Sequence, residues 1–264
     1  MAGEALTRPH VRTGWLLSCG RLSYREAWAL QRALVAARQA DRIEDTLILV
    51  EHPPVITIGR AGRPANVLVS RSLLAARGID VYEIERGGDV TYHGPGQLVG
   101  YPILNLRALD EDVVRYIRLL EAALINALGT YGIVAHRLRG YPGVWVGEAK
   151  IAAIGVAVKR KVTMHGFALN VAPHLDDFTL INPCGLGKPV TSMARLLGRP
   201  VSVEEVAPTV VRALSALLAV EFAPMPVESI RSRIGEAASS GWGEGIGPAT
   251  ARTSQEIANE GGTR

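Results

Sequence analysis

The chain has 264 residues, of which 48% are hydrophobic and 20% charged, a composition typical of globular proteins. Its formal net charge of +4 comes without a run of Lys and Arg or an alternation of basic and aromatic residues, so nothing indicates a nucleic-acid partner. No apolar run is long enough to span a membrane and no signal-peptide pattern is present, so we expect a cytoplasmic protein with no membrane association.

The chain contains two cysteines, Cys19 and Cys184, in unrelated sequence contexts. They do not indicate a disulfide framework, and the spacings typical of zinc sites are missing. Neither of the glycine-rich patterns of nucleotide-binding loops occurs. We therefore expect neither a metal nor a cofactor.

The predicted elements follow a loose arm at residues 1–13. Ser23 and Glu26 have the spacing of a capping box, which predicts the start of an amphipathic helix. Ser202 and Glu205 repeat this spacing before a later helix. In chain order we expect strand 15–17, helix 24–40, strands 46–50 and 55–58, helix 70–77, strands 79–85 and 98–106, helix 110–128, strands 144–146, 150–158 and 162–171, and helix 202–220.

Hairpins and longer crossovers are both present in this order of elements. The three consecutive strands from 144 to 171 have tight turns and predict an antiparallel meander. We therefore predict an α+β domain over 1–223, with a mixed, largely antiparallel sheet and packed helices. From residue 224 the sequence is rich in Pro, Gly, Ser and Glu, so 224–264 is predicted to be a disordered tail.

Cys184 and Lys150 have surroundings that suit chemistry. Cys184 lies in a Pro/Gly-rich loop, where a thiol is reachable, although most free cysteines are small buried hydrophobes. Lys150 precedes the apolar run Ile-Ala-Ala-Ile, where desolvation would lower its pKa, but a lysine at a strand end is usually a surface residue. As a neutral base or as a pairing cation, Lys150 could activate the thiol. The sequence does not establish that the two side chains meet.

A second group of candidates lies near glycines. Arg86-Gly87-Gly88 offers a cation beside backbone that a ligand can approach closely, although a plain turn would contain the same glycines. His93 precedes Gly-Pro-Gly and is a candidate for the site, and His165 is a weaker one. His52 and Cys19 are expected to be structural.

Four blocks of sequence resemble the octanoyltransferase family when taken together over residues 15–220. They are RGGDVTYHGPGQ at 86–97, GVWV at 143–146 with KIAAIG at 150–155, HGFALN at 165–170 and PCG at 183–185. The resemblance implies a single domain similar in fold to biotin and lipoate protein ligases. It also implies transfer of an octanoyl group from octanoyl-acyl carrier protein to a lysine of lipoyl domains.

Site roles follow from the same resemblance. Cys184 would be the nucleophile that holds the acyl group as a thioester, and Lys150 would lower its pKa. The acceptors would be the lipoyl domains of 2-oxoacid dehydrogenase complexes and the glycine cleavage H protein. The residues implied to line the acyl site are Arg86, Gly87, Gly88, Asp89, Val90, Thr91, Tyr92, His93, Ala153, Ile154, Gly155, Gly166, Phe167 and Ala168.

Other functions stay open at the level of sequence. An ATP-dependent lipoate or biotin protein ligase would use the same scaffold without needing Cys184. A thioesterase would release the acyl group to water, and a non-catalytic module would bind an acylated carrier without reacting. The oligomeric state is open, with a monomer as the working expectation.

Overall fold

The computed structural model describes residues 11–182 and 187–234. Its helices are α1 (Tyr24–Gln39), α2 (Arg71–Ala76), α3 (Val113–Gly129), α4 (Met193–Leu197), α5 (Val203–Leu218) and α6 (Val227–Ile234), with 3-10 turns η1 (Pro64–Asn66), η2 (Leu106–Leu109) and η3 (Leu175–Leu180). Its strands are β1 (Arg12–Arg21), β2 (Asp45–Glu51), β3 (Val55–Ile58), β4 (Asp80–Glu83), β5 (Val90–His93), β6 (Gln97–Ile103), β7 (His136–Leu138), β8 (Tyr141–Val146), β9 (Ala149–Lys159), β10 (Val162–Asn170) and β11 (Val220–Pro224).

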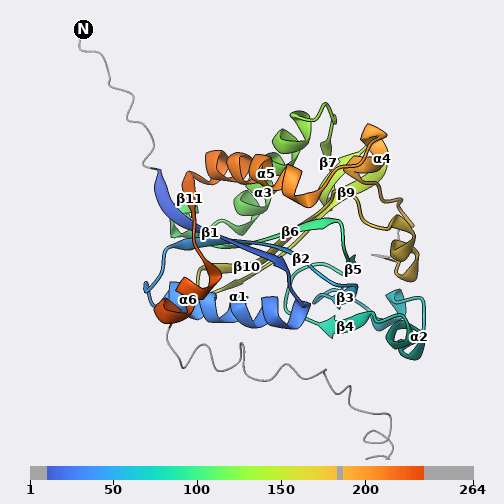
Figure 1. Ribbon diagram of the computed structural model, residues 1–264, viewed down its shortest axis with the longest axis horizontal. Helices are drawn as coiled ribbons and strands as arrows, with labels where there is room; N and C mark the ends of the chain where they lie inside the picture. Colours follow the sequence, from blue (N-terminus) through green and yellow to red (C-terminus); the bar gives the residue numbers. More distant parts are fainter. Residues whose placement is uncertain (1–10, 183–186, 235–264) are drawn as a thin grey trace, which may run out of the picture.

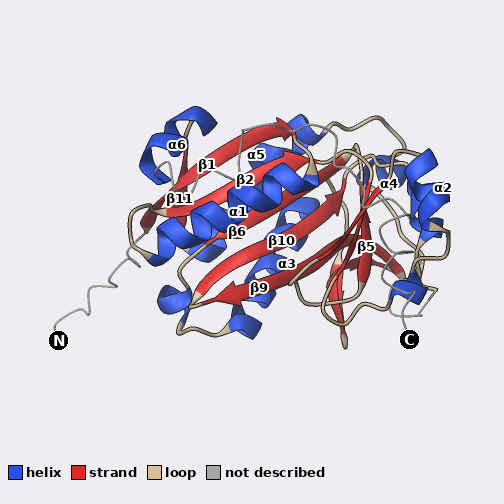
Figure 2. Ribbon diagram, turned by 90° about the horizontal axis from the view of Figure 1, so that it is seen from below, coloured by secondary structure: helices blue, strands red, loops and turns tan. Residues whose placement is uncertain are grey.

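The larger sheet has eight strands in the order β11-β1-β2-β6-β10-β9-β8-β7. β11, β1 and β2 run parallel, and the other neighbours pair antiparallel. Helices α1 and α6 cover one face and α3 and α5 the other (Figure 1; Figure 2 shows the strands from below). The predicted α+β class with a mixed, largely antiparallel sheet is confirmed, as is the meander from β8 to β10.

Local sequence signals account for the helix starts. Ser23 and Glu26 make both hydrogen bonds of the predicted capping box. At α5, Ser202 caps the backbone N–H of Glu205, but the Glu205 carboxylate accepts a hydrogen bond from Arg199 at 2.9 Å. The second capping box is therefore only half formed, because an arginine nearby competes for the carboxylate.

The prediction of a disordered tail from residue 224 is wrong for its first part. Residues 227–234 form α6, whose Ile230 and Ile234 are fully buried against α1 and the sheet. These two side chains lie one helical turn apart. The helix was not predicted because the tail as a whole is polar in composition. Residues 235–264 lie outside the described part of the chain.

Strand β1 is longer than predicted and begins inside the expected N-terminal arm. It starts at Arg12 because it pairs with β11 on one side and β2 on the other. Strands β5, β7 and β11 were not predicted. Each has at most five residues, too few to give a periodic pattern.

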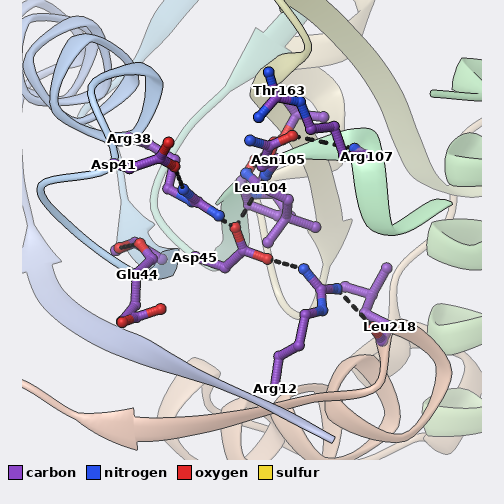
Figure 3. Close-up of polar contacts among 12 residues, drawn as sticks. Arg12, Arg38, Asp41, Glu44, Asp45, Leu104, Asn105, Arg107, Thr163 and Leu218 are labelled. Carbon is purple, nitrogen blue, oxygen red and sulfur yellow. Dashed lines mark hydrogen bonds and ion pairs between the residues drawn. The ribbon is translucent and has the colours of Figure 1, made fainter. Parts of the chain in front are cut away.

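A buried carboxylate joins three elements at the start of β2 (Figure 3). Asp45 is 2% exposed and pairs with Arg12 of β1 and with Arg38 of α1, the latter at 2.9 Å. It also accepts the backbone N–H of Asn105 at 3.0 Å. This cluster anchors the sheet at the start of β2.

A small sheet in the order β4-β3-β5 lies beside the larger one. The loop from residue 84 to 89 leaves β4 and returns into β5, and Gly87 donates its N–H to Val156 O of β9 at 2.8 Å. The loop therefore connects the two sheets. None of the helices within the described ranges has the length and apolar composition needed to cross a bilayer.

Candidate active site

A cavity of about 650 Å³ opens where the 84–89 loop and β5 meet the seam between β9 and β10. Lys150 and most of the predicted acyl-site residues line it. Those that do are Arg86, Gly87, Gly88, Asp89, Val90, Thr91, His93, Ala153, Ile154, Gly155, Gly166, Phe167 and Ala168.

Tyr92 does not line the cavity. Its strand neighbours Val90, Thr91 and His93 all line the cavity, whereas the Tyr92 side chain is directed toward η3. There its ring packs against Phe178, and its hydroxyl donates to Asp177 at 2.7 Å. The resemblance implied that the whole block from Arg86 to His93 lines the acyl site, and Tyr92 is the member of that block that does not line the cavity.

Strand register brings two distant blocks together. In the β9–β10 pair, Ala153 lies opposite Ala168 and Gly155 opposite Gly166. A Cβ on Gly155 would lie 3.0 Å from both Arg86 Cδ and Gly87 O. A larger residue at position 155 would crowd the Arg86 loop, so the glycine leaves the space that this loop occupies.

Arg86 is a buried cation, only 8% exposed. Its Nη2 donates to Thr57 O at 2.8 Å and to Thr57 Oγ1 at 3.0 Å, and its Nη1 donates to Gly87 O at 3.1 Å. Asp89, three residues on, accepts a hydrogen bond from Asn66 at 2.6 Å. The side chains of the loop are thus held by the segment around β3 and η1.

Lys150 lies at the beginning of β9, half-buried, with Nζ 4.8 Å from the centroid of the Trp145 ring. Its backbone N–H donates to Pro189 O at 2.9 Å and its carbonyl accepts from Thr191 N at 3.0 Å. Cys184 lies outside the described residues. The segment that follows it along the chain runs beside Lys150.

A chain of polar side chains extends from that segment into the cavity. Asn170 donates to Thr191 O at 3.0 Å and accepts from Gln97 Nε2 at 3.0 Å. The Gln97 side-chain oxygen lies 3.1 Å from His93 Nδ1. Gln97 and Asn170 ended two of the blocks in the sequence, but only the fold shows that their amides meet.

The histidines near the cavity are buried, and burial lowers their pKa values. Burial, together with the nearby His52 and Arg86, lowers the pKa of His93 well below its ordinary value. Burial also lowers the pKa of His165, and its Nε2 lies 3.6 Å from the Glu85 carboxylate. The backbone of His165 is in the left-handed region, with φ +58°. His52 was expected to be structural. Its pKa is lowered by burial to about 4, and it bonds Leu22 O and the Tyr101 hydroxyl at 2.7 Å each.

Sequence reasoning missed part of the wall. Tyr24 of α1 and Tyr101 of β6 line it near the histidines, and Trp145 of β8 lies near Lys150. Val113 and Ile117 contribute from α3, and their helical spacing was the one available signal. Among the described residues no cluster of three or more His, Cys, Asp or Glu could hold a metal.

The chain matches a known protein family over most of its length. The family model of the lipoyl protein ligase A/B catalytic domain matches residues 23–215. An octanoyltransferase of Solibacter usitatus is 50% identical over 214 residues, covering 81% of this chain and 97% of the relative. One of Koribacter versatilis is 50% identical over 203 residues, covering 75% and 81%.

Solved structures share the fold. A bipartite lipoate protein ligase of Thermoplasma acidophilum aligns with a TM-score of 0.70 at 20% identity, covering 87% of this chain and 93% of that one. Lipoate-protein ligase A with bound ATP aligns with a TM-score of 0.68 at 22% identity, covering 86% and 95%. The predicted likeness in fold to lipoate ligases is confirmed. Together with the sequence matches, it places the chain in the lipoyl protein ligase A/B catalytic domain family, as an enzyme of the octanoyltransferase type.

Proposed function

We propose that the octanoyl group passes through a thioester on Cys184, from octanoyl-acyl carrier protein to a lysine of a lipoyl domain. The observation that carries the proposal is the pairing of Lys150 with Pro189 and Thr191. It keeps the strand end that bears the lysine beside the segment that follows the cysteine. The acyl group would be bound by residues 86–93 other than Tyr92, by residues 153–155 and by residues 166–168.

In the first half-reaction the Cys184 thiolate attacks the carbonyl carbon of the donor thioester. The bond from that carbon to the carrier sulfur breaks, and the carrier leaves as a thiol after taking one proton. In the second, a neutral lysine amine of the acceptor attacks the new thioester. An amide forms, the Cys184 sulfur leaves, and the proton lost by the amine balances the charge.

Lys150 would assist both steps in one of two ways. A neutral lysine would take the thiol proton and return it to the leaving sulfur, whereas a charged lysine would stabilise the thiolate by pairing with it. Its place on the cavity wall suits either role.

Substrate binding divides between the acyl chain and the protein partners. Burial of six methylenes at about 0.8 kcal/mol each is worth about 5 kcal/mol, enough for a preference in chain length but for modest affinity only. Contacts with the carrier would supply the rest, and the net charge of +4 suits acidic partners. The proposed acceptors are the lipoyl domains of 2-oxoacid dehydrogenase complexes and the glycine cleavage H protein, used by a monomeric enzyme.

The test is intact-protein mass spectrometry after mixing the chain with octanoyl-acyl carrier protein in the absence of ATP. We expect one added octanoyl group on the wild type and on Cys19→Ser, and none on Cys184→Ser. Subsequent addition of a lipoyl domain should move the group to the domain.

Each alternative has its own outcome. An unmodified wild type would refute the thioester route. Octanoylation of the lipoyl domain by Cys184→Ser from free octanoate and ATP would identify a ligase. Release of octanoate to water in the presence of acceptor would identify a thioesterase.

A further inference from the structure

Glu121 is a buried carboxylate on α3 that does not line the cavity, and its side chain is 1% exposed. Its Oε2 accepts hydrogen bonds from Arg118 Nη1 at 2.8 Å and from Arg137 Nε at 2.9 Å. Its Oε1 accepts the backbone N–H of Gly143 in β8 at 3.2 Å. Burial of a carboxylate is costly unless partners of this kind satisfy it. The carboxylate therefore ties α3 to β7 and β8.

Gly143 is the point at which β8 departs from regular strand geometry. Its φ is +125°, and the register of β8 with β9 shifts within the two residues that follow it. A Cβ at this position would lie 2.5 Å from Ala152 O and 3.6 Å from Lys150 Cε. Glu121 thus binds β8 where the strand passes beside the lysine side chain.

The Trp145 ring belongs to the same short segment, residues 141–145. Its Nε1–H donates to Tyr141 O at 3.2 Å, so this hydrogen bond spans the segment that has Gly143 at its centre. Trp145 lies opposite Lys150 in the β8–β9 register, and Lys150 Nζ is 4.8 Å from the centroid of the ring. A lysine ammonium at this distance from an indole ring is attracted to its face. The 141–145 segment is therefore a wall against which the lysine side chain lies.

We propose that Glu121 is a positioning residue for Lys150. By binding Gly143 it keeps the 141–145 segment in place, and the Trp145 ring of that segment keeps the lysine amine at the cavity. The inference rests on the proposed function, because the effect of Glu121 on acylation passes through Lys150. Glu121 itself touches no substrate.

Replacement of the carboxylate tests the proposal. Glu121→Leu removes both oxygens, and its arginine partners, whose side chains are 52% and 41% exposed, are free to turn to solvent. The acylation rate at saturating donor should fall about 3- to 15-fold at pH 7, with the upper bound set by loss of the Lys150 amine itself. Glu121→Gln keeps an oxygen that can accept the Gly143 N–H, so its rate should stay within about twofold of wild type.

Two readouts separate positioning of Lys150 from a general structural effect. In a Lys150→Ala background, Glu121→Leu should change the acylation rate by less than about twofold. The rate ratio between wild type and Glu121→Leu should also shrink to less than about twofold at pH 9, where the thiol ionises without help. An undiminished effect in the Lys150→Ala background, a ratio that stays constant with pH, or an equal loss in Glu121→Gln would each overturn the inference.

Asp45→Asn is the matched control. Asp45 is likewise a buried carboxylate with two arginine partners and one backbone N–H, and it does not line the cavity. Its replacement should lower stability and, at a temperature at which the variant stays folded, leave the acylation rate within about twofold of wild type. A slowing equal to that of Glu121→Leu would overturn the inference.

A second measurement does not depend on turnover. In a spectrum of ¹⁵N-labelled tryptophan, the Trp145 Nε1–H signal, assigned by its loss in Trp145→Phe, should shift or broaden in Glu121→Leu and return in Glu121→Gln. The signal of Trp28, which donates to Glu85 at 3.1 Å, should stay unchanged. An unchanged Trp145 signal in Glu121→Leu would overturn the inference even if the rate fell.

Gly143→Ala is the second variant, for use if Glu121→Leu does not fold. It displaces the same segment with the carboxylate in place, because a Cβ would meet Ala152 O. It should show the same change in the Trp145 signal and the same decrease of the rate ratio toward pH 9, and the absence of both would overturn the inference. Absence of an octanoyl adduct on the wild type would instead refute the proposed function.

Discussion

Replacement of Lys150 tests the proposed activation of the thiol most directly. The lysine is half-buried, with its Nζ over the Trp145 ring and its backbone paired with residues 189 and 191. Lys150→Ala removes the amine, and the backbone pairing does not depend on the side chain. We therefore expect the flanking segment to stay in place while acylation slows.

The size of the effect follows from thiol ionisation. A thiol of pKa about 8.5 is about 3% thiolate at pH 7, whereas a neighbouring cation that lowers the pKa by about 1.5 units raises this to about 50%. Lys150→Ala should then slow acylation about 15-fold at pH 7. Because the thiol of the variant ionises at higher pH, the difference should shrink to less than about twofold at pH 9.

Acylation is followed by quenched-flow mass spectrometry between pH 6 and 9.5. Lys150→Arg separates the two roles, because arginine keeps the charge but does not act as a neutral base. Near-wild-type acylation would favour the pairing cation, and a loss equal to that of Lys150→Ala would favour the base. Lys188→Ala is the matched control, since Lys188 Nζ lies 5.8 Å from the centroid of the same Trp145 ring and it pairs with Glu148. A rate ratio between wild type and Lys150→Ala that stayed constant with pH would refute the reasoning.

Three further predictions concern the scaffold. Asp45→Asn should lower the free energy of unfolding in urea by about 3 kcal/mol, because it breaks a buried ion pair. Asp41 also pairs with Arg38, but its side chain is 67% exposed, so Asp41→Asn should lower the free energy of unfolding by less than about 1 kcal/mol. His52 has a folded-state pKa of about 4, below that of the unfolded chain, so its unfolded form takes up a proton first as pH falls. Stability should therefore drop below pH 6.5 by up to about 1.4 kcal/mol per pH unit, and His52→Gln should reduce this slope in urea titrations between pH 7 and 5. Gly155→Ala should displace the Arg86 loop and slow acylation, whereas Gly129→Ala, with open space at its Cβ, should retain the wild-type rate.

The sequence predicted elements whose signals are local. The capping pair at Ser23, the helical periodicity of α1 and the three strands from β8 to β10 are each signalled by residues close together in the sequence. The same holds for the motif blocks, which located most of the cavity wall. Local signals did not predict α6, because its two isoleucines are buried only through contacts with α1 and the sheet, which are distant in the sequence.

Other parts of the site depend on contacts across the fold. Thr57 and Arg86 are 29 positions apart, and nothing in the strand containing Thr57 indicates that a guanidinium will bind there. Tyr24 and Tyr101 reach the cavity from α1 and β6, elements that read as ordinary helix and strand. Tyr92 belongs to a motif block and was expected to line the site, but a motif does not show which of its members face the cavity.

Strand register explains why the site needs all of these segments at once. Gly155 opposite Gly166 leaves room for the Arg86 loop, and that loop is fixed to β9 by Gly87 and to β3 by Thr57. Five residues before Gly155 on the same strand, Lys150 holds residues 189–191, which Asn170 also binds from β10. A slip of one residue between β9 and β10 would turn one set of side chains to the opposite face and separate the arginine wall from the lysine end. The cavity is therefore a property of this register, and the proposed chemistry depends on two strands rather than on any one motif.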